Sequence, residues 1–262
     1  MADSIEELKH KVALSCKILA MMGLVKDILG HVSVRIPGTE EMLVRCRGPQ
    51  ESGLLFTIDD DVRRTDFSGK GPDLAGGYFA PGETPIHGES LRLRPNVNCV
   101  IHAHPPGALM VGVGKVAMRP IIGSYDGGFT IEHTVNGMPL FPHAYLISRP
   151  ELAHRMLHHM GNHHVCIMKG HGVTITGASV EDATIRALRF ESACRIHWQL
   201  ALAGREPDDV SGETMNEFAL RLAAPPSGLS ERTASMTWNY YVRLLETRAS
   251  VPVSVGVGDL MI

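Results

Sequence analysis

The sequence predicts one three-layer α/β domain over residues 1–262, with further helices at its C-terminal end. Segments with a helical hydrophobic period alternate along the whole chain with short apolar or alternating segments that are typical of strands. A chain of 262 residues is long enough for one large domain or two small ones. Because we find neither an internal repeat nor a convincing linker in its first 200 residues, we expect a single domain.

The N-terminal half begins with a helix and continues with strands. Ser4 and Glu7 form the capping box of this helix, apolar residues follow at helical spacing, and Gly23 ends it. A loop rich in Gly and Pro precedes a second helix, which has Thr84 as its N-cap. Between the two helices the pattern predicts three strands, at residues 31–36, 42–45 and 54–57.

The second half repeats the alternation and then becomes helical. Ser148 and Glu151 are expected to cap one helix, and Ser179 caps the longest helix, which ends at Gly204. Strands are predicted at residues 98–103, 164–168 and 173–176, a helix from residue 105, and a loop at 123–128. Residues 205–212 link to helices at about 213–223 and 231–246, and a tail follows from 251.

Composition excludes several classes of protein. The chain has 25 Lys and Arg against 28 Asp and Glu, with no long basic run, so we expect no nucleic-acid surface. The first residues are acidic and no apolar stretch approaches a membrane span, which predicts neither a secretory signal nor a membrane anchor. The five scattered cysteines form no CxxC pair and indicate buried free thiols in a reducing cytoplasm.

Two histidines one residue apart, His102 and His104, are the most informative residues. Side chains at i and i+2 of a strand project from the same face, so both imidazoles could reach one metal ion. A third imidazole, His171, lies in a Gly-His-Gly turn at the end of another apolar run. Three protein ligands would leave one position open for a substrate. Since fourteen histidines make accidental spacings common, spacing alone supports chance and a metal site about equally.

Four motifs occur together in one order: Gly30-His31-Val-Ser-Val-Arg, Pro-Gly-Glu83, Cys-Val-Ile-His102-Ala-His104, and Lys-Gly-His171-Gly. In this order they resemble the class II aldolase/adducin family, over about residues 8–203. The resemblance implies that His102, His104 and His171 hold a divalent cation and that Glu83 is an acid/base. It also implies a mixed, largely antiparallel sheet between helical layers, and a homotetramer with active sites near subunit boundaries.

The sequence departs from the sugar-phosphate aldolases of that family. Where those enzymes carry hydroxyl and amide groups for a phosphate, this chain has Gly30-His31, Arg45-Cys46-Arg47 and Pro81-Gly82. The pattern is more similar to the aromatic-acid decarboxylase branch. That resemblance implies removal of a carboxyl group ortho to a ring hydroxyl, from a diacid such as 3,4-dihydroxyphthalate or 3-hydroxy-2-methylpyridine-4,5-dicarboxylate.

Three further residues are candidates for substrate binding. If Arg45 and Arg47 continue a strand, they share a face and could hold a second carboxylate, although a solvated basic strand edge fits equally well. His31 could donate to the substrate or cap a turn. His87, four residues after Glu83, is a weaker candidate for facing the site or supporting Glu83.

The ligand set leaves both the metal and the reaction open. Imidazoles suit Mn, Zn, Fe and Co, and we expect Mn or Zn, with Mn favoured by the resemblance alone. Decarboxylation and aldol cleavage both need a cation that stabilises an enolate, and in both Glu83 would move a proton. The alternatives are therefore an aldolase or epimerase acting on a small hydroxy-carbonyl compound, and an adducin-like binding protein without catalysis.

Overall fold

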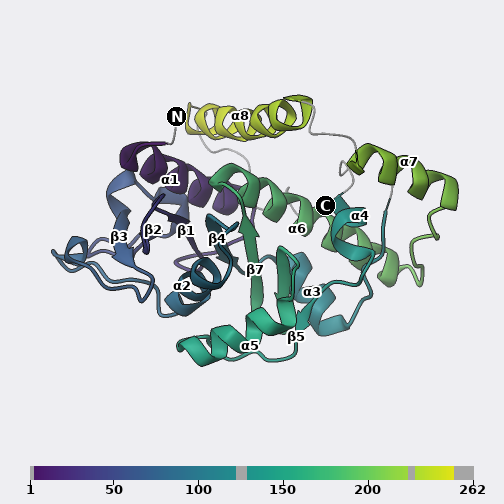
Figure 1. Cartoon of the computed structure of the whole chain (residues 1–262), viewed down its shortest axis with the longest axis horizontal. Coiled ribbons are helices and arrows are strands. Elements are labelled where there is room, and N and C mark those ends of the chain that lie inside the picture. Colours follow the sequence, from purple (N-terminus) through teal and green to yellow (C-terminus); the bar gives the residue numbers. More distant parts are fainter. Residues whose placement is uncertain (1–2, 122–128, 224–227, 251–262) are drawn as a thin grey trace.

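A seven-stranded sheet lies between two helical layers in the computed structural model of the chain, which describes residues 3–121, 129–223 and 228–250 (Figure 1). The strands are ordered β3-β2-β1-β4-β7-β6-β5, and every neighbouring pair is antiparallel except β5 and β6. The expected mixed, largely antiparallel sheet is confirmed. The strands are β1 (His31–Arg35), β2 (Glu41–Arg45), β3 (Val62–Asp66), β4 (Cys99–Ala103), β5 (Leu140–Phe141), β6 (Val165–Met168) and β7 (Gly172–Gly177).

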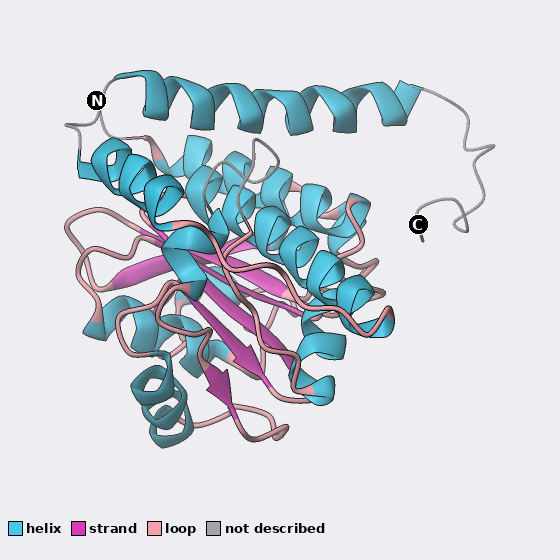
Figure 2. Ribbon diagram, turned by 90° about the vertical axis from the view of Figure 1, so that its right-hand side faces the viewer, coloured by secondary structure: helices cyan, strands magenta, loops and turns pink. Residues whose placement is uncertain are grey.

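One face of the sheet packs against three helices and the other face against two. The first layer contains α1 (Ile5–Met21), α3 (Pro106–Gly114) and α6 (Val180–Leu202), and the second contains α2 (Thr84–Leu93) and α5 (Pro150–Met160) (Figures 1 and 2). Each layer buries its own apolar cluster against the sheet, and these are called the α1–α6 cluster and the α2–α5 cluster below. In β1, for example, Val32 and Val34 face α1 and α6, so His31 and Ser33 face the α2 layer.

The remaining helices lie outside these layers. The short helix α4 (Phe129–Thr134) contacts α6, and α8 (Gly228–Ser250) lies across α1 and α6 as the outermost helix of Figure 2. Trp238 of α8 is buried in the α1–α6 cluster. The helix α7 (Gly212–Ala223) lies between α6 and α8 in the sequence.

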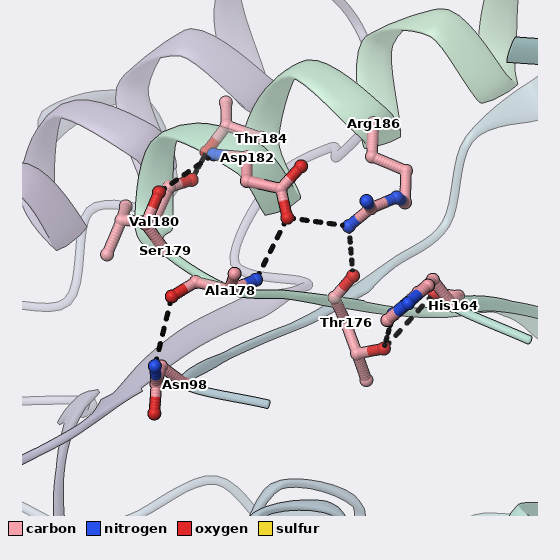
Figure 3. Close-up of polar contacts among 9 residues, drawn as sticks. All are labelled: Asn98, His164, Thr176, Ala178, Ser179, Val180, Asp182, Thr184 and Arg186. Carbon is pink, nitrogen blue, oxygen red and sulfur yellow. Dashed lines mark hydrogen bonds and ion pairs between the residues drawn. The ribbon is translucent and has the colours of Figure 1, made fainter. Parts of the chain in front are cut away.

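The N-terminus of α6 is fixed to the end of β7 by the cap that the sequence predicts. The Ser179 hydroxyl accepts a hydrogen bond from the Asp182 amide at 3.2 Å (Figure 3). The Asp182 carboxylate accepts from the Ala178 amide and from Arg186, and Arg186 also donates to the Thr176 carbonyl. The capping box of Ser4 and Glu7 at α1 is likewise confirmed.

Three local predictions are wrong. The helix predicted to be capped by Ser148 starts at Pro150 with Arg149 as its N-cap, and no side chain makes a capping bond there. Residues 54–57 are not a strand: Leu54–Phe56 forms a 3-10 turn, followed by a second at Asp59–Asp61 and then by β3. Another 3-10 turn, Pro72–Leu74, lies in the Gly- and Pro-rich loop.

The third error concerns α2, where Thr84 is the first helical residue and Glu83 occupies the N-cap without a side-chain capping bond. The loop expected at 123–128 and the tail from 251 lie outside the described residues. Within the described residues, no helix combines the length and the apolar character that crossing a membrane requires. All five cysteines are buried free thiols; Cys16, Cys99 and Cys194 lie in the α1–α6 cluster, and Cys46 and Cys166 in the α2–α5 cluster.

Candidate metal centre

Four side chains from three parts of the fold converge at the edge of the α2 layer. Glu83, His102, His104 and His171 each offer one ligand atom, and these four atoms lie within 4.8 Å of one another. The Nε2 atoms of His102 and His104 are 3.0 Å apart. One Glu83 oxygen, Oε2, lies 3.3 Å from the Nε2 atoms of both His102 and His171. The structure therefore brings together the four residues that the sequence selects.

The pairing of β4 with β7 explains why His171 meets the two strand histidines. His102 lies opposite Thr174 and Ala103 opposite Val173, so the turn before β7 lies beside the end of β4. That approach requires glycine at position 172, because a Cβ atom there would lie 2.4 Å from the Ala103 carbonyl oxygen. Gly170 adopts a φ of +70°, which lets the chain reverse and direct His171 toward β4.

The donor set fits a divalent cation. Two ligands of one ion lie at most about 4.2 Å apart, which is twice a metal–nitrogen distance of roughly 2.1 Å. The four atoms lie within 4.8 Å of one another, so an inward movement of a few tenths of an ångström brings them all within reach of one ion. The Nδ1 atoms of all three rings are buried without a protein partner, whereas the Nε2 atoms face one another and Glu83. Among the described residues this is the one group of three or more such side chains that converges in this way.

Glu83 is held as a carboxylate by its neighbours. Burial raises the pKa of Glu83, but contacts with His102 and His171 and a hydrogen bond from the Ile147 amide at 2.8 Å outweigh burial. The net result is a pKa far below the usual glutamate value. Burial by itself would favour the protonated form of this group; in this arrangement the surrounding donors have the larger effect.

A row of hydrogen-bonded side chains lies next to the metal centre. The ring of His31 stacks on that of His102 with centroids 5.1 Å apart, and His31 Nδ1 lies 2.6 Å from His87 Nε2. The other nitrogen of His87, Nδ1, lies 2.7 Å from the hydroxyl of Ser33. Sequence reasoning missed Ser33, although its position two residues after His31 in a strand places both on one face.

The two arginines proposed as a carboxylate clamp both have protein partners, and both lower the pKa of Glu51. Arg45 shares its sheet face with Leu43, on the α1 side, where its guanidinium is buried and paired with Glu51 at 2.5 Å. This is the sheet face opposite His31 and His102. Arg47 lies beyond the end of β2, where its backbone pairs with Phe79 and its guanidinium donates to the Ile28 carbonyl at 3.1 Å. The regular strand β2 ends at Arg45, and Arg47 follows it as a bridge residue; a joint role of the two arginines in binding a substrate carboxylate stays a prediction.

The remaining histidines of α5 do not join the centre. His154, His158 and His159 are exposed on that helix. His154 nevertheless has a carboxylate partner that the sequence did not suggest, since it lies 2.7 Å from Glu89 of α2. This pair links the two helices of one layer.

Comparisons with protein families, with known sequences and with solved structures all point to one family. Residues 10–198 match the Class II Aldolase and Adducin N-terminal domain. The chain is 41% identical to a 3,4-dihydroxyphthalate decarboxylase of Arthrobacter keyseri over 213 residues, which is 80% of this chain and 85% of that enzyme. It is 38% identical to the 3,4-dihydroxyphthalate decarboxylase of Terrabacter sp. over 79% of this chain and 87% of the enzyme. A crystal structure of an aldolase II superfamily protein from Pseudomonas syringae has the same fold, with a TM-score of 0.76, 21% identity and 95% coverage of both chains.

Proposed function

The chain belongs to the class II aldolase and adducin family, and we propose that it is a metal-dependent, non-oxidative decarboxylase of a hydroxylated aromatic or pyridine dicarboxylate. The observation that carries this proposal is the convergence of three imidazoles and one carboxylate, in a chain 41% identical to an enzyme named for that reaction. Candidate substrates are 3,4-dihydroxyphthalate and 3-hydroxy-2-methylpyridine-4,5-dicarboxylate. Each has a ring hydroxyl next to the carboxyl group to be removed.

His102, His104 and His171 would hold one divalent cation in each subunit. Their all-nitrogen set suits Mn²⁺ or Zn²⁺, with Fe²⁺ and Co²⁺ as alternatives. When bound, such a cation supplies a Lewis acid that stabilises negative charge developing on a substrate oxygen.

Glu83 would handle the proton. As a carboxylate it can take the proton of the ring hydroxyl and deliver it to the ring carbon that bears the departing carboxylate. The carbon–carbon bond then breaks, CO₂ leaves, and the bonding electrons pass through the ring to its oxygen, which restores aromaticity. The resulting phenolate takes one proton from solvent, so hydrogen replaces CO₂ in the net reaction.

Substrate binding would fall mainly to His31, whose ring stacks on His102, and secondarily to Arg47. Arg45 is assigned a structural role instead, because its buried guanidinium is paired with Glu51 on the other side of the sheet. This assignment predicts that Arg45→Met lowers stability and leaves KM unaltered in the variant that folds.

The test combines elemental analysis with an assay of CO₂ release. We expect one divalent ion per chain and CO₂ from an ortho-hydroxy aromatic diacid, with loss on chelation and recovery on adding Mn²⁺ or Zn²⁺. His171→Gln should lose metal and activity, whereas the matched variant His158→Gln, changed at an exposed histidine of α5, should keep both. Aldehyde release from a ketose without CO₂ would identify an aldolase instead. Absence of metal and of turnover would favour an adducin-like binding protein.

We also propose that the active enzyme is a homotetramer with sites near subunit boundaries, as the family resemblance implies. Large apolar side chains are exposed where the loop before β1 meets the first 3-10 turn: Ile28, Leu29, Leu55 and Phe56. Several exposed large apolar side chains on neighbouring segments are typical of an interface. Light scattering should give a tetramer for the natural chain and a smaller species for Phe56→Asp; an unchanged mass would place the interface elsewhere.

A further inference from the structure

Three buried side chains form a hydrogen-bonded chain that ends beside the metal centre. It runs from the Ser33 hydroxyl to His87 Nδ1 at 2.7 Å, and from His87 Nε2 to His31 Nδ1 at 2.6 Å. Ser33 and His87 have no exposed surface, and His31 is 7% exposed. Ser33 and His31 belong to β1 and His87 to α2, so the chain links two elements.

The contacts point to two neutral imidazoles. A nitrogen–nitrogen hydrogen bond needs one of the two rings to accept. Among the described residues neither ring forms an ion pair with a carboxylate, so a charge on either buried ring would be uncompensated. A neutral imidazole carries one N–H and one acceptor nitrogen. The two contacts can therefore be satisfied in only two ways, with all the protons pointing toward the centre or all pointing away from it.

The Ser33 end of this hydrogen-bonded row selects between the two proton directions. If the protons point toward the centre, Ser33 donates to His87, His87 donates to His31, and each buried hydrogen has an acceptor. If they point away, His87 donates to Ser33 and the Ser33 hydroxyl hydrogen needs another acceptor. Among the described residues the hydroxyl of Ser33 has no partner other than His87. An unsatisfied buried donor costs free energy, so the first direction is favoured.

The other end of this hydrogen-bonded row is the Nε2 atom of His31. This nitrogen makes no hydrogen bond within the described residues, and it is not among the fully buried unpartnered atoms. Since the ring of His31 stacks on that of His102, this nitrogen belongs to a side chain at the metal centre. It is therefore available to a bound molecule.

We propose that Ser33 and His87 are positioning residues that fix His31 in the tautomer with its proton on Nε2, which presents an N–H donor to a carboxylate of the substrate. The assignment of the ligand as a carboxylate rests on the proposed function, whereas the tautomer does not. A neutral donor fixed in this way favours an anionic oxygen acceptor over a donor group such as a hydroxyl hydrogen or an ammonium group.

The tautomer can be measured without a substrate. Long-range ¹H–¹⁵N correlation spectra of the Zn²⁺-loaded, ¹⁵N-histidine-labelled protein distinguish Nδ1-H from Nε2-H rings, and His31→Gln identifies the signal of His31. We expect the Nε2-H form in the natural chain and a mixture of both forms in Ser33→Ala. Ser15→Ala, which removes another fully buried hydroxyl, bonded to Thr184 at 2.7 Å, should leave the His31 signals unchanged. An Nδ1-H ring in the natural chain, or an unaltered tautomer in Ser33→Ala, would overturn the proposal.

Kinetics provides a second test. Loss of one oriented hydrogen bond in Ser33→Ala should raise KM for the diacid on the order of fivefold, with little change in kcat. His87→Gln keeps an N–H opposite His31 Nδ1, so its KM should stay close to the natural value. A monoacid that lacks the carboxylate held by His31 should show no such rise, and an equal rise for both acids would contradict the proposal. If no diacid is turned over at all, the proposed function fails while the spectra still decide the tautomer.

Discussion

Two buried glutamates flank the strand that carries the paired histidines, and their surroundings give them different roles. Glu83 is the N-cap of α2, before β4, and Glu191 lies within α6 against the start of α3, after β4. Both oxygens of Glu191 accept hydrogen bonds from the Gly107 and Ala108 amides, and Arg195 adds a third. Only one oxygen of Glu83 accepts from a backbone amide, and the other faces the histidines.

The difference shows that burial alone does not identify a chemically active carboxylate. The side chains are similarly buried, with exposures of 7% for Glu83 and 4% for Glu191. Burial dominates for Glu191 and raises its pKa despite the two amides and Arg195, whereas the histidines reverse the effect of burial at Glu83 and lower its pKa. A carboxylate with both oxygens bound to permanent donors stabilises the fold; one whose second oxygen faces the ligand atoms of a metal site can act on a substrate.

The largest expected effect is on turnover in Glu83→Gln. Because the amide cannot carry the proton to the ring carbon, kcat should fall on the order of 10²–10⁴-fold, the usual contribution of a general acid–base. Metal content should remain close to that of the natural chain, since the three histidines stay. The matched variant Glu191→Gln should keep most of its activity per folded molecule. Comparable activity in the two variants would remove the distinction between the glutamates.

The next effect is on stability in Glu191→Ala. The substitution leaves the two α3 amides without their acceptor and Arg195 without its partner, so the free energy of unfolding should fall by about 2–4 kcal/mol. Urea denaturation followed by circular dichroism measures this change. Glu83→Gln should lose much less, and an equal loss in the two variants would show that Glu83 is also a structural residue.

The smallest effect is the pH dependence that Glu191 contributes. Its pKa in the folded chain is raised above the usual value of 4.5, so folding favours the protonated form. The resulting stabilisation is fully present below the unfolded pKa and is lost as pH rises through the folded pKa. The difference in unfolding free energy between the natural chain and Glu191→Gln should therefore shift against the natural chain from pH 4.5 upward. A shift in the other direction would mean that the amides and Arg195 outweigh burial.

The parts of the site that are close in sequence could be predicted, and those that depend on long-range pairing could not. His102 and His104 share a face because a strand has a period of two, and the capping signals of Ser4 and Ser179 are local as well. The motif order of the family supplied Glu83. Nothing local connects His87 to His31, since that contact exists only because α2 packs on β4, which pairs with β1.

The errors have similar physical reasons. The partners of Arg45 and Arg47, which are Glu51 and the Ile28 carbonyl, depend on how loops fold back onto β2, and no local pattern shows them. The strand β3 escaped prediction because two of its five residues are arginines at the edge of the sheet, one of them paired with Glu41 of β2. The two-residue strand β5 is too short for any periodic pattern, and it forms by pairing in parallel with β6.

The distribution of the cysteines offers a way to follow how the two layers open. Burial raises the pKa of the Cys16, Cys46 and Cys166 thiols to about 12, so an alkylating reagent should react slowly with the native chain. Labelling then reports transient exposure, and peptide mapping assigns it: Cys16 and Cys194 to the layer of α1 and α6, Cys46 and Cys166 to the layer of α2 and α5. The natural chain thus carries its own reporters for the order in which its two cores come apart.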